Sequence, residues 1–309
     1  MDNATAQPTL TFVDSTELLQ NPEALRERAK EDGLLFFRGL LDKEKLLELR
    51  RQIYTLLDQR GLFDRNFPLM DGMADYEAVN ALDVSGLHGV GVPDDLYKDV
   101  QKLEAFQAML HRPELLQVYR TLFGEEVLPH PKTIARIVVP HRQLHVTPPH
   151  QDFLHIQGEP NTWTSWFPLG DCPKELGGLS ILKGSHKEGI IGVTNHGGAG
   201  GLETILCNMN YQWVYGDYQL GDVVCFHSWT VHRAMPNQLG SRVRISCDFR
   251  YQPVSAVIDP NSLTPHGPWE WDDLYSGYEN EDIKYYWEKR QLTFSQWDDS
   301  IRWQKEKIC

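Results

Sequence analysis

The sequence contains no run of about 18 apolar residues, the length that a membrane-crossing helix needs. Its N-terminal segment, MDNATAQPTL, has no basic start followed by an apolar stretch, so we expect no secretory signal. Positive charge is scarce as well: 30 Lys and Arg residues stand against 43 Asp and Glu, which gives a formal net charge of −13. Broad binding to nucleic acid or to an anionic membrane needs a basic face. We therefore expect a cytoplasmic protein with neither nucleic acid nor membrane as its partner.

Cysteine is scarce too, and no CxxC pair occurs among the 309 residues. This spacing predicts neither a disulfide framework nor a cysteine-based zinc site. Hydrophobic residues make up 41% of the chain and charged residues 24%, a composition that can bury a core. The five cysteines are scattered over the second half of the chain: Cys172, Cys207, Cys225, Cys247 and Cys309.

Helical patterns dominate the N-terminal part of the chain. Helices are predicted over residues 16–33, with Thr16 as the cap, and 42–61, with Asp42 as the cap, and each ends at a glycine. A short apolar strand lies between them, and residues 62–92 are predicted to form a long loop of unknown role. The helical pattern returns over residues 93–123.

The pattern changes to short strands after Gly124 and stays so up to Pro253. These runs are rich in β-branched and aromatic residues, and Gly, Pro, Asn and Asp separate them. They read TIARIVVP, WTSWFPLG, LSILKG, YQWVYGDYQL, DVVCFHSW and RVRISCDFRYQP. Strands without alternating helices indicate a β-sandwich or barrel. We expect a single domain with a helical part at 1–125, a β core at 126–253 and a C-terminal extension at 254–309 of unknown role.

Two segments of the β core carry side chains suited to a metal. In PPHQDFLH, His150 and Asp152 are two residues apart, so they point to the same face of an extended chain. His232 lies just before the turn NQLG and completes a set of two histidines and one carboxylate. Such a set binds iron(II) on one face and leaves positions open for substrate and dioxygen. A polar strand end with a His–Asp hydrogen bond is the alternative for the isolated HxD pair.

The sequence offers two candidates for the second histidine of this set and two for an arginine that could pair with a carboxylate. His227 lies five residues before His232, but it belongs to the apolar strand DVVCFH, which is typical of a structural histidine. Arg242 lies ten residues after His232, across one turn, where a guanidinium can form a two-pronged pair with a carboxylate. Arg244 has the same parity, so side-chain direction does not separate the two arginines. Arg242 is nearer the turn and is preferred; a surface charge is its alternative.

In the frame HxD…GDVV-F…H-x-x-x-PN…R, these residues resemble the phytanoyl-CoA dioxygenase-like branch of the iron(II)/2-oxoglutarate oxygenases. The stretch WTSWFPLGDCPKELGGLSILKGSHKEG is similar to the linking region of that branch, and the resemblance covers about residues 130–252. It implies a mainly β fold, a double-stranded β-helix (a jelly roll or cupin-like barrel) with the N-terminal helices packed outside.

The same resemblance implies that His150, Asp152 and His232 bind Fe(II) and that Arg242 holds the distal carboxylate of the cosubstrate 2-oxoglutarate. The family reaction uses O2, releases succinate and CO2, and usually hydroxylates the substrate. Halogenating relatives replace the carboxylate ligand with a small residue, so Asp152 favours hydroxylation, desaturation or a related oxidation. Thr164 is a further candidate for the cofactor pocket, with Arg244 as a second-layer charge.

Two more side chains are weaker candidates for the pocket. Trp166 alternates with Thr164 on the same strand, although an aromatic core role suits it better, and Arg136 is a candidate second anion contact.

The predicted function is oxidation of a small or medium organic metabolite. The chain is acidic and has no basic cluster for a phosphorylated adenosine, which favours an uncharged or amino-acid-like metabolite over an acyl-CoA. The alternatives are a cupin-type metal enzyme without 2-oxoglutarate and a catalytically silent metabolite-binding barrel. The substrate, the type of oxidation and the oligomeric state are left open by the sequence.

Overall fold

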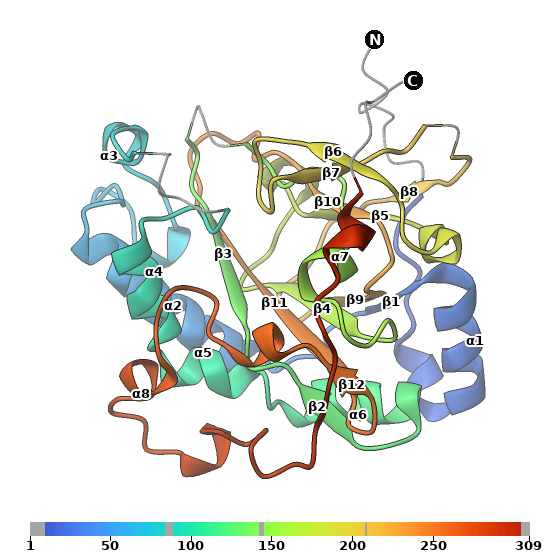
Figure 1. Cartoon of the computed structure of the whole chain (residues 1–309). Coiled ribbons are helices and arrows are strands. Elements are labelled where there is room, and N and C mark those ends of the chain that lie inside the picture. The colour runs from blue at the N-terminus through green and yellow to red at the C-terminus, as the bar shows by residue number, and fades with distance from the viewer. Residues whose placement is uncertain (1–9, 84–88, 142–144, 208, 304–309) are drawn as a thin grey trace.

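The computed structural model describes residues 10–83, 89–141, 145–207 and 209–303 (Figure 1). Among the described residues up to Phe123, helices predominate, and one short strand, β1 (Leu34–Phe37), lies between the first two α-helices in the chain. The helices are α1 (Pro22–Asp32), α2 (Lys43–Gln59), α3 (Tyr76–Asn80), α4 (Asp94–Gln101), α5 (Glu104–Met109) and α6 (Pro113–Phe123), with 3-10 turns at Thr16–Gln20 and Leu69–Asp71.

The helix boundaries follow the local capping chemistry. Asp42 caps α2 as predicted, because its side chain accepts hydrogen bonds from the backbone N–H groups of Glu44 and Lys45. The predicted first helix is divided instead: Thr16 begins a 3-10 turn, and Asn21 caps α1 by accepting from the N–H of Ala24. The predicted loop at 62–92 contains α3 and a 3-10 turn within its described residues.

Two antiparallel sheets form the β core. The larger sheet has the order β1-β9-β4-β11-β2, with β3 also paired to β11, and the smaller has the order β10-β5-β8. The larger sheet adds to β1 the strands β2 (Val127–Pro129), β3 (Ile134–Val138), β4 (Trp163–Pro168), β9 (Val223–His227) and β11 (Arg244–Pro253). The smaller sheet consists of β5 (Leu179–Leu182), β8 (Trp213–Val214) and β10 (His232–Ala234).

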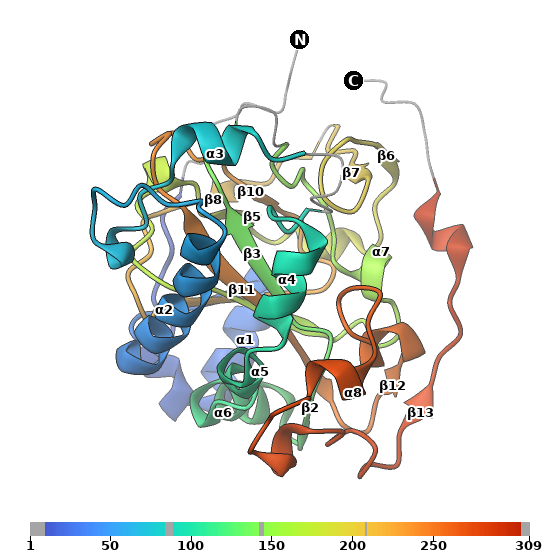
Figure 2. The same ribbon diagram turned by 90° about the vertical axis from the view of Figure 1, so that its left-hand side faces the viewer.

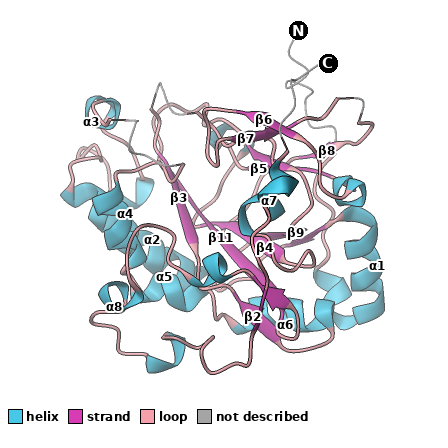
Figure 3. Cartoon of the chain, viewed as in Figure 1, coloured by secondary structure: helices cyan, strands magenta, loops and turns pink. Residues whose placement is uncertain are grey.

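The remaining elements are short and lie around these sheets (Figure 3). Two strand pairs lie outside them, β6 (Val193–Asn195) with β7 (Leu202–Thr204) and β12 (Val257–Ile258) with β13 (Thr293–Phe294). The short helices are α7 (Phe153–Ile156) and α8 (Trp271–Leu274), and the later 3-10 turns are Lys174–Leu176, Ser185–Glu188, Pro260–Leu263, Glu281–Ile283 and Asp299–Arg302.

Successive side chains of each strand point to opposite sides of the large sheet, so the sheet has two different faces. The helices α2, α4 and α5 lie to the left of β3 and β11 in Figure 1, the side that faces the viewer in Figure 2. Apolar side chains of the sheet join those of the helices in one core, among them Ile137, Phe167, Cys247 and Phe249. The opposite face carries polar residues and a second apolar cluster shared with the small sheet, so the two sheets face one another. No strand pairing among the described residues closes them into a barrel.

The C-terminal extension packs on the same body through aromatic side chains. Trp271, Tyr275 and Trp287 form a cluster with Leu128 of β2. Cys172, Cys225 and Cys247 are free and buried. In the described part of the chain, no helix has the length and apolarity to cross a membrane; the cytoplasmic location stays a prediction.

Candidate active site

His150, Asp152 and His232 meet where the two sheets face each other. His150 lies in the segment before α7, Asp152 immediately precedes that helix, and His232 opens β10. The backbones of His150 and His232 pair in both directions, with each N–H donating to the other residue's carbonyl at 3.0 Å. This bridge brings the two rings to 4.1 Å between centroids. The sequence prediction that these three residues form one group is confirmed.

Hydrogen bonds fix which nitrogen of each imidazole is free. Nδ1 of His150 lies 2.8 Å from the Pro148 carbonyl, and Nδ1 of His232 lies 3.0 Å from the Thr230 carbonyl. A carbonyl only accepts, so each Nδ1 carries the proton and each Nε2 keeps its lone pair. Both Nε2 atoms lie 3.8 Å from Oδ1 of Asp152. Burial, then the neighbouring His232, lowers the pKa of His150 to about 3, and burial also lowers that of His232.

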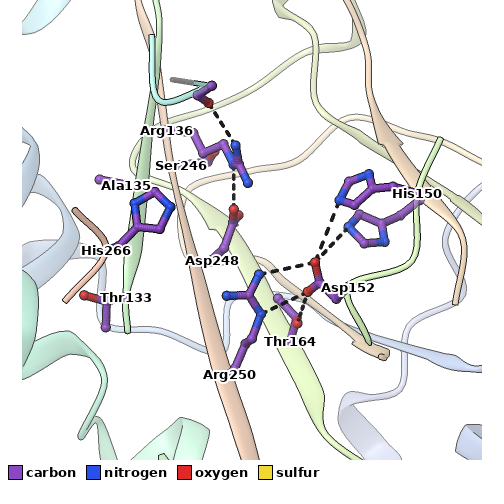
Figure 4. Close-up of polar contacts among 12 residues, drawn as sticks. Thr133, Ala135, Arg136, His150, Asp152, Thr164, Ser246, Asp248, Arg250 and His266 are labelled. Carbon is purple, nitrogen blue, oxygen red and sulfur yellow. Dashed lines mark hydrogen bonds and ion pairs between the residues drawn. The ribbon is translucent and has the colours of Figure 1, made fainter. Parts of the chain in front are cut away.

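Asp152 is oriented from its other side (Figure 4). Its Oδ2 accepts hydrogen bonds from Oγ1 of Thr164 at 2.6 Å and from Nε of Arg250 at 3.1 Å. Nη2 of Arg250 donates to Oδ1 at 3.2 Å and completes a two-pronged pair. Burial, the largest single effect, would raise the pKa of Asp152. The charge and hydrogen bonds of Arg250, together with the two neighbouring histidines, outweigh it and hold that pKa well below its usual range. The carboxylate is therefore ionised.

This donor set fits iron(II). Two neutral imidazoles and one ionised carboxylate present three ligand atoms that all lie within 4.8 Å of one another, and all three residues are buried. Nitrogen and oxygen donors without a thiolate, arranged on one side, suit a non-haem iron centre with open positions. The hydrogen bonds to Nδ1 and Oδ2 are the outer contacts that orient such ligands.

Three adjoining cavities surround the triad. The inner cavity is lined by the triad together with Thr164, Trp166 and Arg244. An apolar cavity of about 410 Å³ shares Arg244 with it and extends along Val138, Met235 and Pro236. A basic cavity of about 190 Å³ borders His150 and Asp152 and is lined by Lys132, Arg136, His155, Arg250 and His266.

The structure separates the two candidate arginines. Arg244 is only 4% exposed and lines the inner cavity. Its Nη1 donates to Oγ of Ser246 at 2.9 Å, and no carboxylate in the described part of the chain pairs with it. The expectation that Arg242 also faces inward is wrong, because its side chain is exposed and its backbone bridges to Met73. Arg242 precedes β11, which begins at Arg244, so the regular alternation of side-chain direction along that strand does not extend to Arg242.

The other predicted residues lie as follows. Thr164 contacts Asp152, and Trp166 both lines the inner cavity and packs with the second apolar cluster. Arg136 pairs with Asp248 at 2.7 Å, so it faces the site but already has a carboxylate partner. His227 is not part of the triad; its Nδ1 accepts from the N–H of Trp229.

Sequence reasoning missed Arg250. It shares the parity of Arg244 on one ten-residue strand, and that parity was the signal that could have found it. Lys132 and His266 were missed as well, because neither belongs to a motif and only the fold brings them to the basic cavity.

Fold and site together define a non-haem iron oxygenase of the two-histidine, one-carboxylate class. The family model described as Phytanoyl-CoA dioxygenase (PhyH) matches residues 29–244, more than half of the chain. The protein therefore belongs to the phytanoyl-CoA dioxygenase family and is a 2-oxoglutarate-dependent dioxygenase.

Relatives and solved structures agree with this assignment. The 1-deoxypentalenic acid 11-beta-hydroxylases of Streptomyces exfoliatus and Streptomyces arenae are each 28% identical over 267 residues, 82% of this chain and 89% of theirs. The epimerase SnoN in complex with Fe3+, alpha ketoglutarate and nogalamycin RO is similar in fold, with a TM-score of 0.53, 18% identity, and coverage of 78% of this chain and 87% of that one. The non-heme monooxygenase ThoJ gives a TM-score of 0.51 at 18% identity, covering 82% and 94%.

Proposed function

We propose that this oxygenase holds 2-oxoglutarate in the inner cavity and oxidises a small or medium organic metabolite, most simply by hydroxylation. His150, Asp152 and His232 are the proposed ligands of iron(II), which would supply open positions for dioxygen and for the 2-oxo acid. Succinate and CO2 are the expected co-products. The presence of Asp152 as a full third ligand supports oxidation rather than halogenation.

Arg244 is the proposed partner of the distal carboxylate of 2-oxoglutarate. Its guanidinium is buried, and its Nε has no hydrogen-bond partner among the described residues. A buried cation without an anion is costly, and a dicarboxylate in the same cavity would supply the missing partner. This uncompensated arginine beside the triad is the single observation that carries the proposal. Thr164 then acts through Asp152, and its direct contact with the cosubstrate stays a prediction.

The apolar cavity supports a metabolite with a substantial hydrocarbon surface. It adjoins the inner cavity at Arg244, Ala234 and Thr147. The curated relatives act on 1-deoxypentalenic acid, which fits a substrate from secondary metabolism. A small-molecule substrate explains the active-site cavities without any nucleic-acid or membrane partner.

We further propose that the two facing sheets form a double-stranded β-helix and that the chain acts as a single domain. The helices of residues 1–125 share one continuous core with the β core of residues 126–253, which argues against independent units. The aromatic extension of 254–309 is anchored on β2 of that core.

Matched arginine variants test this proposal. Arg244→Met should weaken 2-oxoglutarate by at least about tenfold while iron stays bound, since losing one partner of a desolvated ion pair costs about 2–5 kcal/mol. Arg242→Met removes an exposed arginine and should leave that affinity unchanged. Calorimetric titration gives the affinities, and succinate release gives turnover.

Other outcomes favour other functions. Iron-dependent oxidation without a need for 2-oxoglutarate would support a cupin-type enzyme. If neither iron nor 2-oxoglutarate binds, the result would support a silent metabolite-binding protein.

A further inference from the structure

The basic cavity contains a cation, Lys132, that forms no ion pair with any described residue. Its lining includes three basic side chains, Lys132, Arg136 and Arg250. Arg250 is paired with Asp152, and Arg136 is paired with Asp248. Lys132 is half-buried just before β3, and no hydrogen bond or ion pair engages its ammonium group within the described ranges. Asp259 acts on Lys132 electrostatically but forms no ion pair with it.

Hydrogen-bond donors converge on the same cavity. Arg250 uses Nε and Nη2 on Asp152, and no partner among the described residues occupies Nη1. The hydroxyl of Tyr97 accepts from Nε2 of Gln101 at 2.8 Å and lies 2.9 Å from Nδ1 of His266. The backbone N–H of Ala135 also donates to this hydroxyl, at 3.3 Å, so both of its acceptor positions are used and its single proton goes to Nδ1 of His266. The proton of the neutral His266 is therefore on Nε2. Burial lowers the pKa of His266 to about 3, so this ring stays neutral.

The cavity therefore offers an ammonium, a free guanidinium N–H and an imidazole N–H. They come from three separated parts of the chain: the segment before β3, strand β11, and the loop between β12 and α8. His155 adds a buried Nε2 with no partner. Among the described lining residues, Asp152 is the one acidic side chain. Such a cluster of donors around one uncompensated charge favours a monoanionic oxygen group.

We propose that the basic cavity is a substrate subsite that binds a carboxylate, with Lys132 as its charge partner and Arg250 and His266 as hydrogen-bond donors. The inference rests on the proposed oxygenase function and specifies its substrate class: an organic acid, where the acidic composition favoured an uncharged or amino-acid-like metabolite. The cavity borders His150 and Asp152. A molecule anchored at Lys132 therefore carries its carbon skeleton past the metal side of the triad.

A matched pair of probes tests the subsite. Hexanoate and hexanamide have the same chain length and differ in charge at one end. Each is titrated calorimetrically, without oxygen, into protein supplied with iron(II) and saturating 2-oxoglutarate. Hexanoate should bind at least about tenfold more tightly than hexanamide, because only the acid pairs with Lys132.

Lysine variants locate the effect. Lys132→Met should reduce the affinity for hexanoate to that for hexanamide and leave 2-oxoglutarate binding unchanged, and Lys132→Arg should keep the preference for the acid. Lys98→Met is the control, since Lys98 is paired with Asp273 on the outer surface of α4. Circular dichroism and the free energy of unfolding establish that each variant is folded.

Three results would overturn the proposed subsite. The first is that the protein shows no preference for hexanoate over hexanamide, or binds neither probe. The second is a preference that survives Lys132→Met, and the third is displacement of 2-oxoglutarate by hexanoate, which would place the probe at Arg244.

The oxygenase proposal can fail independently of the subsite. A preference that depends on Lys132 without any binding of iron or 2-oxoglutarate would retain the anion site and reject the oxygenase. Succinate release that depends on Arg244, without a preference for the acid, would reject only the subsite.

Discussion

Arg250 holds the single carboxylate of the triad with two N–H groups, and both residues are about 5% exposed or less. Removing one partner of so deeply buried an ion pair is destabilising, because the other charge is then buried without compensation. Thr164 adds one hydrogen bond to the same carboxylate. The orientation and the ionised state of the iron ligand therefore both depend on a residue that does not itself touch the metal.

Arg250→Met should lower iron(II) affinity by about tenfold to a hundredfold, the usual effect of losing an outer contact to a metal ligand. Without the guanidinium, burial raises the pKa of Asp152, so protons compete with the metal and the loss should be greater at about pH 6 than at about pH 8. Anaerobic calorimetry measures the affinity. Arg112→Met, which removes a partly buried arginine paired with Glu114 away from the triad, is the control. Equal affinities for Arg250→Met and the unsubstituted protein would mean that Thr164 alone orients Asp152.

The triad could be predicted from the sequence because His150 and Asp152 form a short local motif. The third ligand, His232, was recognisable from its position just before a turn. The sequence did not predict which arginine faces the cavity. Arg242 and Arg244 have equal parity, and the outcome depends on where β11 begins, which is fixed by the backbone contact of Arg242 with Met73. That contact joins residues about 170 positions apart, and no short-range rule contains it.

At the scale of elements, strand prediction succeeded where the apolar run is continuous. TIARIVVP contains β3, WTSWFPLG contains β4, and DVVCFHSW contains β9. The segment YQWVYGDYQL gives only the two-residue β8 and an isolated bridge from Tyr218 to Cys172. The helix predicted from Thr16 failed because Pro22 is best placed in the first turn of a helix, so α1 starts there.

Gly91 shows how closely one segment approaches the large sheet. Its φ is +94°, and an added Cβ would lie 1.9 Å from the carbonyl oxygen of Ile137. The neighbouring Val90 carbonyl accepts the N–H of Ile137 at 2.8 Å, so this backbone runs along the exposed edge of β3. Only a residue without a side chain permits this approach, which also forms a wall of the apolar cavity.

Gly91→Ala should therefore cost about 2–4 kcal/mol of unfolding free energy, from backbone strain and a forced displacement of the segment. Gly61→Ala is the matched control: φ there is +71°, but an added Cβ meets nothing within 4 Å. Gly61→Ala should lose only about 1 kcal/mol of unfolding free energy, from backbone strain without a steric clash. Urea unfolding measures both. Similar losses in the two variants would mean that the segment at Gly91 shifts freely away from β3.

At the scale of the whole molecule, net charge and local charge have opposite signs. The chain carries −13 overall, yet its central cavities contain Arg136, Arg244, Arg250 and Lys132. Composition excluded a broad basic surface and held no information about the interior, because the four cations are separated in sequence and meet only through strand pairing. An acidic exterior with a cationic interior suits a protein whose small anions bind deep inside.

The interior also contains many histidines held neutral, which makes stability sensitive to acid. His130, which is not part of the triad, is 1% exposed, and its Nε2 contacts Oε1 of Gln252 at 2.8 Å. Burial lowers the pKa of His130 to about 4. Its Nδ1 has no partner, so a second proton would be buried without an acceptor. Burial likewise lowers the pKa of His111 to about 4 and that of His227 to about 3.

We expect the free energy of unfolding of the metal-free protein to fall as the pH drops below about 6.5, the ordinary histidine value. Between there and the folded-state pKa, the unfolded chain binds a proton at His130 and the folded chain does not, which costs about 1.4 kcal/mol per pH unit. Above about pH 6.5 both states are neutral and the slope vanishes. His130→Gln should make the acid slope shallower by up to this amount in urea unfolding at a series of pH values, whereas His145→Gln, at an exposed position, should leave it unchanged. A slope in His130→Gln as steep as in the unsubstituted protein would show that His130 gains its proton without leaving the folded state.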